Sequence, residues 1–457
     1  ILAQASSGIR VFEMLAFCQH SVPAAHSLVT VASPGERSAH RAFLGRHSRG
    51  IALAVPFFGA VAFAGTRSRA QTRVQRKAAL RAVAMSASGG QNLAGKPTIS
   101  VGVIGTGVVG GELLKQIAGF VDENAGLVDL QVRAVAGSKQ MLLGDGPISL
   151  KNATVGLSSM DSTARLSNTD LALFADSLRV PGSKAVIVDC TASEAVSDHY
   201  ASWLRSGVSV VTPNKKAGSA DFGVYSETKA AAVSGGAAWM YEATVGAGLP
   251  LISTAQSLVT TGDEVHEIEG ILSGTLSYIF NTMVPGSKFS DVVRDAKVKG
   301  FTEPDPRDDL SGTDVQRKCI ILARECGLKL NLEDVPVESL VPEGLRNWEP
   351  PAGANLADAF IDALAEYDDE MEARMKAAGG VLRFVGTVDV RNGTAKVGLR
   401  AFPADHPFAS TQFADNMVVF STKRYTPRPL VVQGPGAGAA VTAAGVFSDL
   451  LHVAGVL

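Results

Sequence analysis

Apolar runs of strand length alternate with amphipathic stretches over residues 96–245. The runs are rich in Val and Ile, as strands buried on both faces are, and the stretch after the first run places Leu113, Leu114 and Ile117 on one helical face. Strands that alternate with helices predict an α/β fold with a parallel, doubly wound sheet. We predict strands at residues 98–104, 128–136, 185–189 and 208–212, and helices at residues 111–120 and 194–206.

The pattern changes beyond this first region. Residues 265–272 predict a strand, and residues 381–400 predict a hairpin that turns at Asn392-Gly393, a favoured dipeptide for tight hairpin turns. Residues 430–457 combine a strand, a glycine-rich turn and a helix, which could return to the first region. We therefore predict a first domain of residues 96–245 plus 430–457 and a second, α+β domain of residues 246–429.

A glycine-rich turn joins the first predicted strand to the first predicted helix. Glycines at these spacings let the backbone approach a pyrophosphate, whose charge is stabilised at a helix N-terminus. The motif alone is weak evidence, and a purely structural turn is the alternative, but its position between strand and helix is the context that dinucleotide binding requires. We predict a Rossmann-type dinucleotide-binding domain whose loop consists of Gly105, Thr106, Gly107, Val108, Val109 and Gly110.

The end of the second predicted strand selects the cofactor. NAD-binding domains usually place an Asp or Glu there for the ribose 2′-hydroxyl, whereas this chain has Gly137, Ser138 and Lys139. A cation without an acid favours a 2′-phosphate. We predict NADP (NADPH) as the cofactor, with Ser138 and Lys139 among its contacts, and use of NAD stays open.

Polar residues follow the third and fourth predicted strands. Thr191 and Ser193 come after the third, and Lys215 comes after the fourth. Ligands of such sheets bind beyond the carboxyl ends of the strands, so we predict these residues at the nicotinamide end of a cleft. Lys215 can polarise a carbonyl there; a solvated loop lysine is the alternative, and Lys216 is the weaker candidate.

The segment at residues 301–318 concentrates carboxylates before a predicted helix. Pro304 and Pro306 predict an extended loop, and Asp314 and Lys318 are four residues apart, so they share a helix face. An acidic bend facing a lysine suits a small ligand with an ammonium and a carbonyl oxygen, and a solvated loop with an ordinary ion pair is the alternative. The carboxylates are Glu303, Asp305, Asp308, Asp309 and Asp314.

Residues 242–250 place a carboxylate before a Gly-rich turn that ends in Pro. Carboxylate and carbonyl oxygens are hard donors that suit cations such as Na⁺ or K⁺. Glu242 and the exposed carbonyls of this turn are therefore a candidate site for a monovalent cation. A simple hinge between the two domains is the alternative.

Tyr225 and Lys229 match the Tyr-x-x-x-Lys pair of short-chain dehydrogenases. That class has a different glycine pattern at its N-terminus and needs a Ser shortly before the Tyr. We therefore predict that Tyr225 and Lys229 belong to a surface helix after Asp221 and are not catalytic.

The charges divide the chain into two unlike parts. The formal net charge is −2, so nothing global predicts binding to nucleic acid or a membrane surface. Residues 1–95 nevertheless hold eleven Lys and Arg against two acids, Glu13 and Glu36, whereas the remainder is net acidic. A basic, Ser/Ala-rich leader of this kind is typical of an organelle transit peptide, with a disordered tail as the alternative. Residues 51–65 are too short and too broken by Pro and Gly to span a bilayer.

The cysteines indicate neither a disulfide framework nor a zinc site. Cys18 lies in the leader, and Cys190, Cys319 and Cys326 show no CxxC or Cys/His spacing. With 457 residues, of which 46% are hydrophobic, the chain can bury one large core or two domains. We predict an enzyme-sized protein in a reducing compartment, and because the chain opens with Ile we expect residues upstream of it.

Seven segments together resemble homoserine dehydrogenase, and specifically the homoserine dehydrogenase half of the bifunctional plant and bacterial aspartokinase–homoserine dehydrogenases. They follow the family's order from about residue 98 to residue 455, so the resemblance covers the chain beyond its leader. The segments are GVIGTGVVGGELL, VDCTASEAVSDHY, VVTPNKKA, YEATVGAGLPLISTAQSL, EGILSGTLSYIFN, GFTEPDPRDDLSGTDVQRK and VVQGPGAGAAVTAAGVFSDLL.

The resemblance implies a role for each matching position. Lys318 matches the proton donor and Asp314 the catalytic aspartate, while Glu303 and Asp309 match the carboxylates that hold the substrate. Lys215 is implied in catalysis and in contacts with both substrate and nicotinamide. The implied nucleotide contacts are Gly105, Gly107, Val108, Gly110, Thr191 and Gly438, and the implied cation ligands are Glu242 and the carbonyls of Val245, Ala247 and Leu249.

The resemblance also implies an activity and partners. The activity is reversible, NADPH-dependent reduction of L-aspartate 4-semialdehyde to L-homoserine, in threonine, methionine and isoleucine biosynthesis, by a homodimer formed through the second domain. We expect no nucleic-acid partner and no membrane attachment of the mature form, and a plastid stroma location, or the cytoplasm if the leader is not functional. Because no aspartokinase half precedes the domain and no regulatory domain follows Leu457, we expect no threonine feedback through such modules.

Two rival functions fit parts of the sequence. Another NADP-dependent oxidoreductase acting on a small amino acid would need the same groups. An NADPH-binding sensor without catalysis would need the glycine turn alone. The Asp314/Lys318 pair argues against the sensor, because a sensor has no need for a proton donor beside an acidic pocket.

Overall fold

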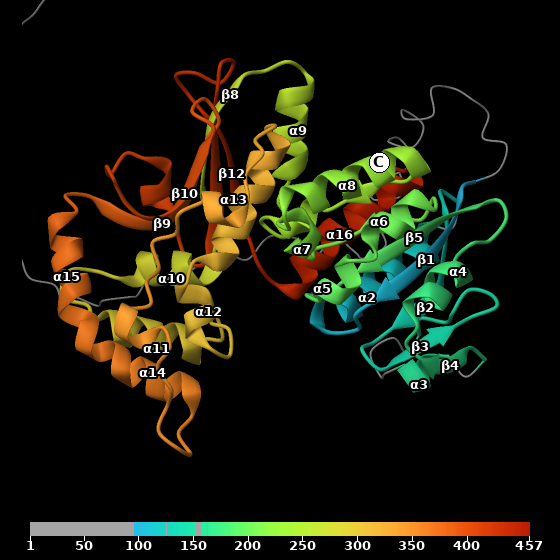
Figure 1. Cartoon of the computed structure of the whole chain (residues 1–457), viewed down its shortest axis with the longest axis horizontal. Coiled ribbons are helices and arrows are strands. Elements are labelled where there is room, and N and C mark those ends of the chain that lie inside the picture. Colours follow the sequence, from blue (N-terminus) through green and yellow to red (C-terminus); the bar gives the residue numbers. More distant parts are fainter. Residues whose placement is uncertain (1–95, 125, 152–156, 162) are drawn as a thin grey trace, which may run out of the picture. The chain divides into compact units, whose positions relative to one another are not determined.

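The computed structural model describes residues 96–124, 126–151, 157–161 and 163–457. The predicted leader, residues 1–95, lies outside the described residues. Two β-sheets organise the described part of the chain (Figure 1). None of its helices is both long and apolar enough to cross a membrane.

The first sheet has seven strands in the order β4-β3-β2-β1-β5-β6-β7. The five strands from β2 to β7 in this order run parallel to one another. This confirms the predicted doubly wound α/β fold, and β1 occupies the predicted residues. The antiparallel pair β3 and β4 was not predicted. The strands are β1 (Thr98–Ile104), β2 (Asp129–Ala136), β3 (Gln140–Leu143), β4 (Arg165–Asn168), β5 (Ser183–Asp189), β6 (Ser209–Val211) and β7 (Trp239–Met240).

Helices cover both faces of this sheet. On one face, α2 (Val108–Asn124) lies beside α16 (Ala439–Ala454), and the two share a core with the side chains of β1 and β5 (Figure 1). The other face packs against α4 (Leu171–Ser177), α6 (Tyr200–Arg205) and α8 (Phe222–Gly235). The helix predicted at residues 194–206 is instead two short helices, α5 (Glu194–Ser197) and α6, because the chain turns at Asp198 and His199.

The second sheet has five antiparallel strands in the order β10-β9-β8-β11-β12. They are β8 (Val265–Ile271), β9 (Val381–Asp389), β10 (Thr394–Phe402), β11 (Asp415–Thr422) and β12 (Leu430–Pro435). The hairpin β9–β10 turns at the predicted Asn392-Gly393. The prediction that residues 430–457 return to the first domain is wrong for β12, which forms the edge of the second sheet; only α16 returns.

Helices cover one face of the second sheet, where α10 (Gly274–Thr282) and α13 (Thr313–Glu325) contact β9 (Figure 1). The opposite face carries a small apolar cluster of Ile271, Val385, Phe402, Phe408, Met417 and Val419. The remaining helices of this region include α9 (Ile252–Thr260), α11 (Phe289–Val298), α12 (Pro306–Leu310), α14 (Leu356–Leu364) and α15 (Asp368–Ala377).

The acidic segment is more structured than expected. Pro306 does not extend the loop but is the first residue of α12, and the Asp305 carboxylate accepts a hydrogen bond from the Arg307 N–H as its N-cap. Proline suits this position because its missing N–H is not needed there. Gly312 then precedes α13 as its N-cap residue at a φ of 74°, a left-handed conformation that glycine adopts without strain.

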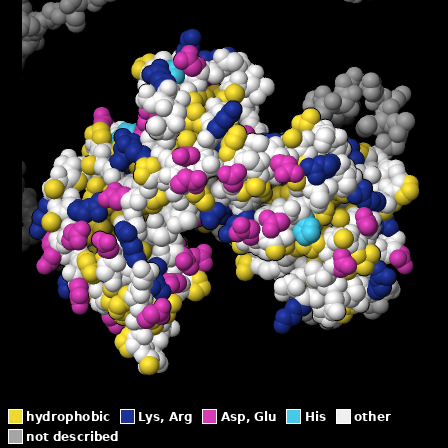
Figure 2. Space-filling view, in the orientation of Figure 1, with side chains coloured by type: hydrophobic (Ala, Val, Ile, Leu, Met, Phe, Trp, Pro, Cys, Tyr) yellow, Lys and Arg dark blue, Asp and Glu magenta, His cyan; other side chains and the backbone are white. Residues whose placement is uncertain are grey.

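Opposite charges intermingle on the face of the molecule seen in Figure 2, where Lys and Arg side chains lie among Asp and Glu. No large area of one sign is visible on that face. This agrees with the near-neutral composition, and long-range steering by a uniform charge is therefore not a feature of this face.

Phe408→Ala is expected to lower the free energy of unfolding by about 3–5 kcal/mol, because the Phe408 side chain is fully buried against Phe402 in the apolar cluster. Urea-induced unfolding followed by fluorescence measures the change. Phe413→Ala is the matched control: that ring is 75% exposed, so its loss should change stability by about 0.5 kcal/mol or less. Equal losses in the two variants would contradict the burial argument.

Candidate functional site

A cavity of about 660 Å³ lies at the carboxyl ends of the first sheet's parallel strands. It is lined from one side by residues after β5 and β6 and from the other by the acidic segment and α13. Residues just after β12 close a third side. The lining includes Val109, Thr191, Asn214, Lys215, Ala247, Ser273, Glu303, Asp308, Asp309, Asp314, Arg317, Lys318 and Gly438.

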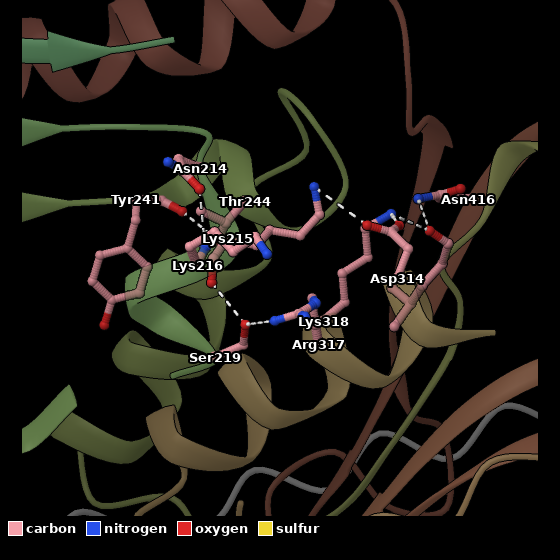
Figure 3. Close-up of polar contacts among 11 residues, drawn as sticks. Asn214, Lys215, Lys216, Ser219, Tyr241, Thr244, Asp314, Arg317, Lys318 and Asn416 are labelled. Carbon is pink, nitrogen blue, oxygen red and sulfur yellow. Dashed lines mark hydrogen bonds and ion pairs between the residues drawn. The ribbon is translucent and has the colours of Figure 1, made fainter. Parts of the chain in front are cut away.

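One carboxylate joins two lysines across this cavity (Figure 3). Asp314 Oδ2 lies 2.7 Å from Lys318 Nζ, and Asp314 Oδ1 lies 3.4 Å from Lys215 Nζ. Partial removal from water would by itself raise the pKa of Asp314, but the two ammonium groups outweigh it and hold that pKa well below its usual range. Asp314 is therefore an anion at neutral pH that fixes both cations.

The Lys318 ammonium is held on two of its three N–H groups. It donates to Asp314 and, over 2.7 Å, to the backbone carbonyl of Leu272. Asn416 Nδ2 donates to the same carbonyl over 3.3 Å, while Asn416 Oδ1 has no partner among the described residues (Figure 3). Because an ammonium carries three N–H groups, one remains for an acceptor in the cavity that Lys318 lines.

A buried hydrogen-bond network fixes the carboxyl ends of β5 and β6. The carboxyl of Asp189, at the end of β5, accepts hydrogen bonds from the Tyr200 hydroxyl at 2.5 Å, from Asn214 Nδ2 at 3.0 Å and from the Thr191 N–H at 2.8 Å. Asn214 in turn caps α7 (Lys215–Gly218), whose first residue is Lys215. The sequence prediction missed Asp189, Tyr200 and Asn214, since buried polar residues leave no periodic signal.

The acidic side of the cavity carries Glu303 and Asp309 beside Thr275. Asp309 Oδ2 accepts a hydrogen bond from the Glu303 N–H at 2.8 Å, and Asp309 Oδ1 lies 2.8 Å from Thr275 Oγ1. Burial raises the pKa of Asp309 to about 6, and the charges of Glu303 and Asp314 add to this rise. The neighbouring Asp305 instead pairs with Arg307, 2.8 Å away, and does not line the cavity.

The glycine turn is built for close approach by a ligand. Gly105 has a φ of 91° and donates from its N–H to the Ala136 carbonyl over 2.7 Å, which ties the turn to the end of β2. A side chain on Gly110 would meet the Gly105 carbonyl, so only glycine lets α2 start so close to β1. Gly107 has open space around it, and the first turn of α2 holds no acid. These features fit a pyrophosphate at the N-terminus of α2.

The predicted adenosine-side contacts lie away from the cavity. Ser138 and Lys139 are exposed after β2, next to Gly137, which approaches Thr106 of the glycine turn. No acid takes their place, so the chain fits a 2′-phosphate there. The predicted residues outside the cavity lining are Gly105, Thr106, Gly107, Val108, Gly110, Ser138, Lys139, Ser193, Glu242, Val245 and Leu249.

Glu242 caps a helix. Its carboxylate accepts the N–H groups of Leu251 and Ile252 at 2.7 Å and of Ser253 at 2.8 Å, at the start of α9. Among the described residues, no group of three or more His, Cys, Asp or Glu could hold a metal. A carboxylate offers about four lone-pair positions, and these three N–H groups use three of those on Glu242.

Tyr225 and Lys229 lie on α8, after the N-cap Asp221, as predicted. Tyr225 is buried rather than on a solvated surface, and the Lys229 ammonium lies 4.7 Å from the centre of the Tyr241 ring. Neither residue lines the cavity. Their positions therefore serve packing between α8 and β7.

Comparison with known proteins gives the family. A sequence profile described as the NAD-binding domain of homoserine dehydrogenase matches residues 105–242, and a second, described as homoserine dehydrogenase, matches residues 250–451. A homoserine dehydrogenase of Schizosaccharomyces pombe is 44% identical over 380 residues, which cover 79% of this chain and 96% of that protein.

Two further comparisons extend this result. The chloroplastic bifunctional aspartokinase/homoserine dehydrogenase 1 of Zea mays is 47% identical over 368 residues, covering 79% of this chain and 39% of that protein. The chain thus spans about two fifths of the length of such bifunctional relatives. A crystal structure of a Candida auris protein of unknown function matches with a TM-score of 0.71 and 38% identity, over 78% of this chain and 98% of that one.

The dinucleotide-binding sheet and the cavity beyond its strand ends define an NAD(P)-dependent oxidoreductase. Within that class, the matches to both domains are specific. The chain belongs to the homoserine dehydrogenase family.

Two alanine substitutions in the glycine turn should separate packing from ligand binding. Gly110→Ala places its methyl group 1.8 Å from the Gly105 carbonyl oxygen, so it should cost about 1–3 kcal/mol of stability and lower the unfolding temperature. Gly107→Ala meets nothing within 4 Å, so it should unfold as the wild type does but bind NADPH at least about tenfold more weakly, because the methyl group occupies the pyrophosphate's space.

Thermal unfolding and fluorescence titration with NADPH measure the two effects. Wild-type NADPH affinity in Gly107→Ala would place the pyrophosphate elsewhere.

Proposed function

We propose that this protein catalyses the reversible, NADPH-dependent reduction of L-aspartate 4-semialdehyde to L-homoserine. The observation that carries the proposal is the Lys215–Asp314–Lys318 bridge, which brings two ammonium groups to one cavity between the nicotinamide-side strand ends and the acidic segment. Reduction of an aldehyde needs a proton and a positive field at the carbonyl oxygen, and both lie there.

Lys318 is the proposed proton donor. Asp314 and the Leu272 carbonyl hold its ammonium on two sides, so the remaining N–H is oriented before the substrate arrives. A positioned acid of this kind contributes on the order of 10²–10⁴-fold to the rate. Lys215 stabilises the developing alkoxide electrostatically, and Asp314 keeps both lysines in place as it does so.

The acidic side binds the amino end of the substrate. Glu303 and Asp309 line the cavity opposite the lysines, and a substrate with an ammonium at one end and an aldehyde at the other spans the two charge types. This charge separation orients the aldehyde toward Lys318. An uncharged aldehyde of similar size would lack the orienting contact.

The glycine turn, Thr191, Ser193, Lys215 and Gly438 are proposed to hold NADPH, with Ser138 and Lys139 at the 2′-phosphate. When bound, the cofactor supplies the hydride for the aldehyde carbon. Gly105, Gly107 and the N-terminus of α2 would hold its pyrophosphate, and the Asp189 network would keep Thr191 and Lys215 in register with it.

Further proposals concern the cation, the assembly and the location. We propose a monovalent cation, Na⁺ or K⁺, at Glu242 and the carbonyls of Val245, Ala247 and Leu249; the hard oxygen donors of this carboxylate and of these carbonyls support it. A homodimer through the second domain is proposed, since the edge strand β12 offers unpaired backbone groups.

A plastid location, with a role in threonine, methionine and isoleucine biosynthesis, is supported by the basic leader and by chloroplastic relatives.

The direct test follows NADPH absorbance with aspartate semialdehyde and then with uncharged aldehydes of similar length. Oxidation of NADPH by the semialdehyde, with homoserine as product, is expected. Faster reaction with an uncharged aldehyde, or binding of NADPH without turnover on any aldehyde, would contradict the proposed function.

Lys318→Ala is expected to lower kcat by about 10²–10⁴-fold, because the proton donor is lost, while the affinity for NADPH stays close to that of the wild type. Steady-state rates and NADPH titration measure the two quantities. Lys376→Ala, at an exposed lysine of α15, is the control and should retain wild-type rates. Weakened NADPH binding with preserved turnover would assign Lys318 a different role.

Glu303→Gln is expected to raise the KM for the semialdehyde by about 10- to 100-fold, since it removes a charge that holds the substrate ammonium. The KM for NADPH should stay within about twofold, and serves as the internal control. An unchanged KM for the semialdehyde would remove Glu303 from the substrate pocket.

A further inference from the structure

The hydroxyl of Thr275 lies between two oxygen atoms. Its Oγ1 is 2.6 Å from the backbone carbonyl oxygen of Phe301 and 2.8 Å from Asp309 Oδ1. Both distances are those of O–H···O hydrogen bonds. A hydroxyl has only one proton to donate, so Thr275 alone can make only one of these two contacts as a linear, full-strength hydrogen bond.

The ability of each partner to donate or accept a hydrogen bond determines which atom carries the proton between Thr275 and Asp309. The Phe301 carbonyl carries no proton and can only accept, so the shorter contact requires Thr275 as the donor. The bond between Thr275 and Asp309 then needs its proton from Asp309. In the opposite arrangement, with Thr275 donating to Asp309, the lone pairs of Thr275 and Phe301 would face each other at 2.6 Å without a proton between them.

We infer that Asp309 is a neutral carboxylic acid in the substrate-free protein in mildly acidic solution, that it donates through Oδ1 to Thr275, and that arrival of the substrate ammonium expels this proton to solvent through the cavity. The inference rests on the proposed function, because it gives the ammonium of the amino-acid substrate as the group that replaces the proton. The step is balanced: Asp309 loses one proton and gains one ion-pair partner.

The second oxygen of Asp309 fits this assignment. Oδ2 accepts the Glu303 N–H at 2.8 Å, as the carbonyl oxygen of a neutral acid does, which leaves Oδ1 as the hydroxyl. Thr275 is buried, with 7% of its surface exposed, so water does not readily replace it as the acceptor. Thr275 is thus a positioning residue that holds the proton of Asp309.

The charges around Asp309 also favour the neutral acid. The carboxylates of Glu303, from its own segment, and Asp314, from α13, act on it, and Asp308 lines the same cavity. The cations of the cavity, Lys215 on α7 and Lys318 on α13, pair with Asp314. Among the described residues, no cation lies within ion-pair distance of Asp309. Burial, with the charges of Glu303 and Asp314, raises the pKa of Asp309 to about 6.

Binding of the substrate ammonium should weaken as the pH falls. Below about pH 6 Asp309 is neutral and attracts an ammonium weakly; above it the carboxylate is anionic and attracts an ammonium strongly. The kcat/KM for homoserine should therefore fall as the pH drops through about 6, with the loss in KM rather than in kcat.

Thr275→Val is the decisive variant, because the two proton positions predict opposite shifts. If Asp309 is the donor, Val removes the acceptor of its proton and destabilises the neutral acid. The apparent pKa of the acidic limb, the low-pH fall in the pH profile of kcat/KM, then drops by about one unit or less. If Thr275 donates to an anionic Asp309, Val removes a stabilising donor and raises that pKa. Homoserine oxidation with NADP⁺ between about pH 5 and pH 7.5 measures the limb.

Thr275→Ser is the matched control, since it keeps the hydroxyl and should leave the limb in place. Asp309→Asn imitates the neutral acid, because its amide N–H can donate to Thr275. Its KM for homoserine should be high and independent of pH, close to that of the wild type at the acidic end. A limb that rises or stays fixed in Thr275→Val, or an unaltered limb in Asp309→Asn, would overturn the inference while leaving the proposed function intact.

A second measurement needs no turnover. Infrared difference spectra recorded during an acid titration of the substrate-free protein should show a protonated carboxyl band that is absent in Asp309→Asn and shifted in Thr275→Val. No such band, or a band that is unchanged in both variants, would overturn the inference even if the protein did not oxidise homoserine. Failure of homoserine oxidation with the band present would instead overturn the proposed function alone.

Discussion

One carboxylate shared between two lysines is the interaction on which the site depends. Asp314 draws its partners from different parts of the chain: Lys318 belongs to its own helix, whereas Lys215 follows β6 of the first sheet. Without the anion, two ammonium groups would face each other across a small cavity and repel. The contact that is proposed to supply charge for chemistry therefore also joins α13, which packs on the second sheet, to the first sheet.

The rest of α13 extends this connection along its length. Arg317 donates to the Ser219 hydroxyl at 3.0 Å, and Arg324 donates to the backbone carbonyls of Gly218 and Ala220. At the end of the helix, the Tyr241 hydroxyl bonds to the Glu325 carboxylate. Because α13 is held to α7 and β7 from its first turn to its last, Lys318 is fixed relative to the strand ends where the nicotinamide is proposed to bind.

Periodic apolar patterns made much of the architecture predictable. The strand at residues 98–104, the glycine turn and the Asn392-Gly393 hairpin each have a strong local signal, and the structure has all three. The elements that were missed lack such signals. Strand β4 is short and mostly exposed, so it has no apolar alternation, and the break between α5 and α6 serves a tertiary contact, the bond from Tyr200 to Asp189.

The charged residues that line the site could be predicted from the sequence, whereas the buried polar residues that hold them in place by hydrogen bonds could not. Asp314 and Lys318 stand at helical spacing beside several carboxylates, which is visible in the sequence. Asp189, Asn214 and Thr275 act through hydrogen bonds that exist only once distant segments meet. Strand β12 was assigned to the wrong domain because a single apolar run does not reveal which sheet it joins; the edge of the second sheet was available to it.

The return of α16 has a consequence for how the protein is made. This helix covers the face of the first sheet on which Val101, Val103 and Val186 lie, yet it is separated from β1 by more than three hundred residues of sequence. A nascent chain on the ribosome that has completed β7 still leaves that apolar face open to water, at a cost that scales with the uncovered area. The first domain can therefore finish folding only after the second domain has been synthesised, so a chain truncated before α16 lacks a complete first domain.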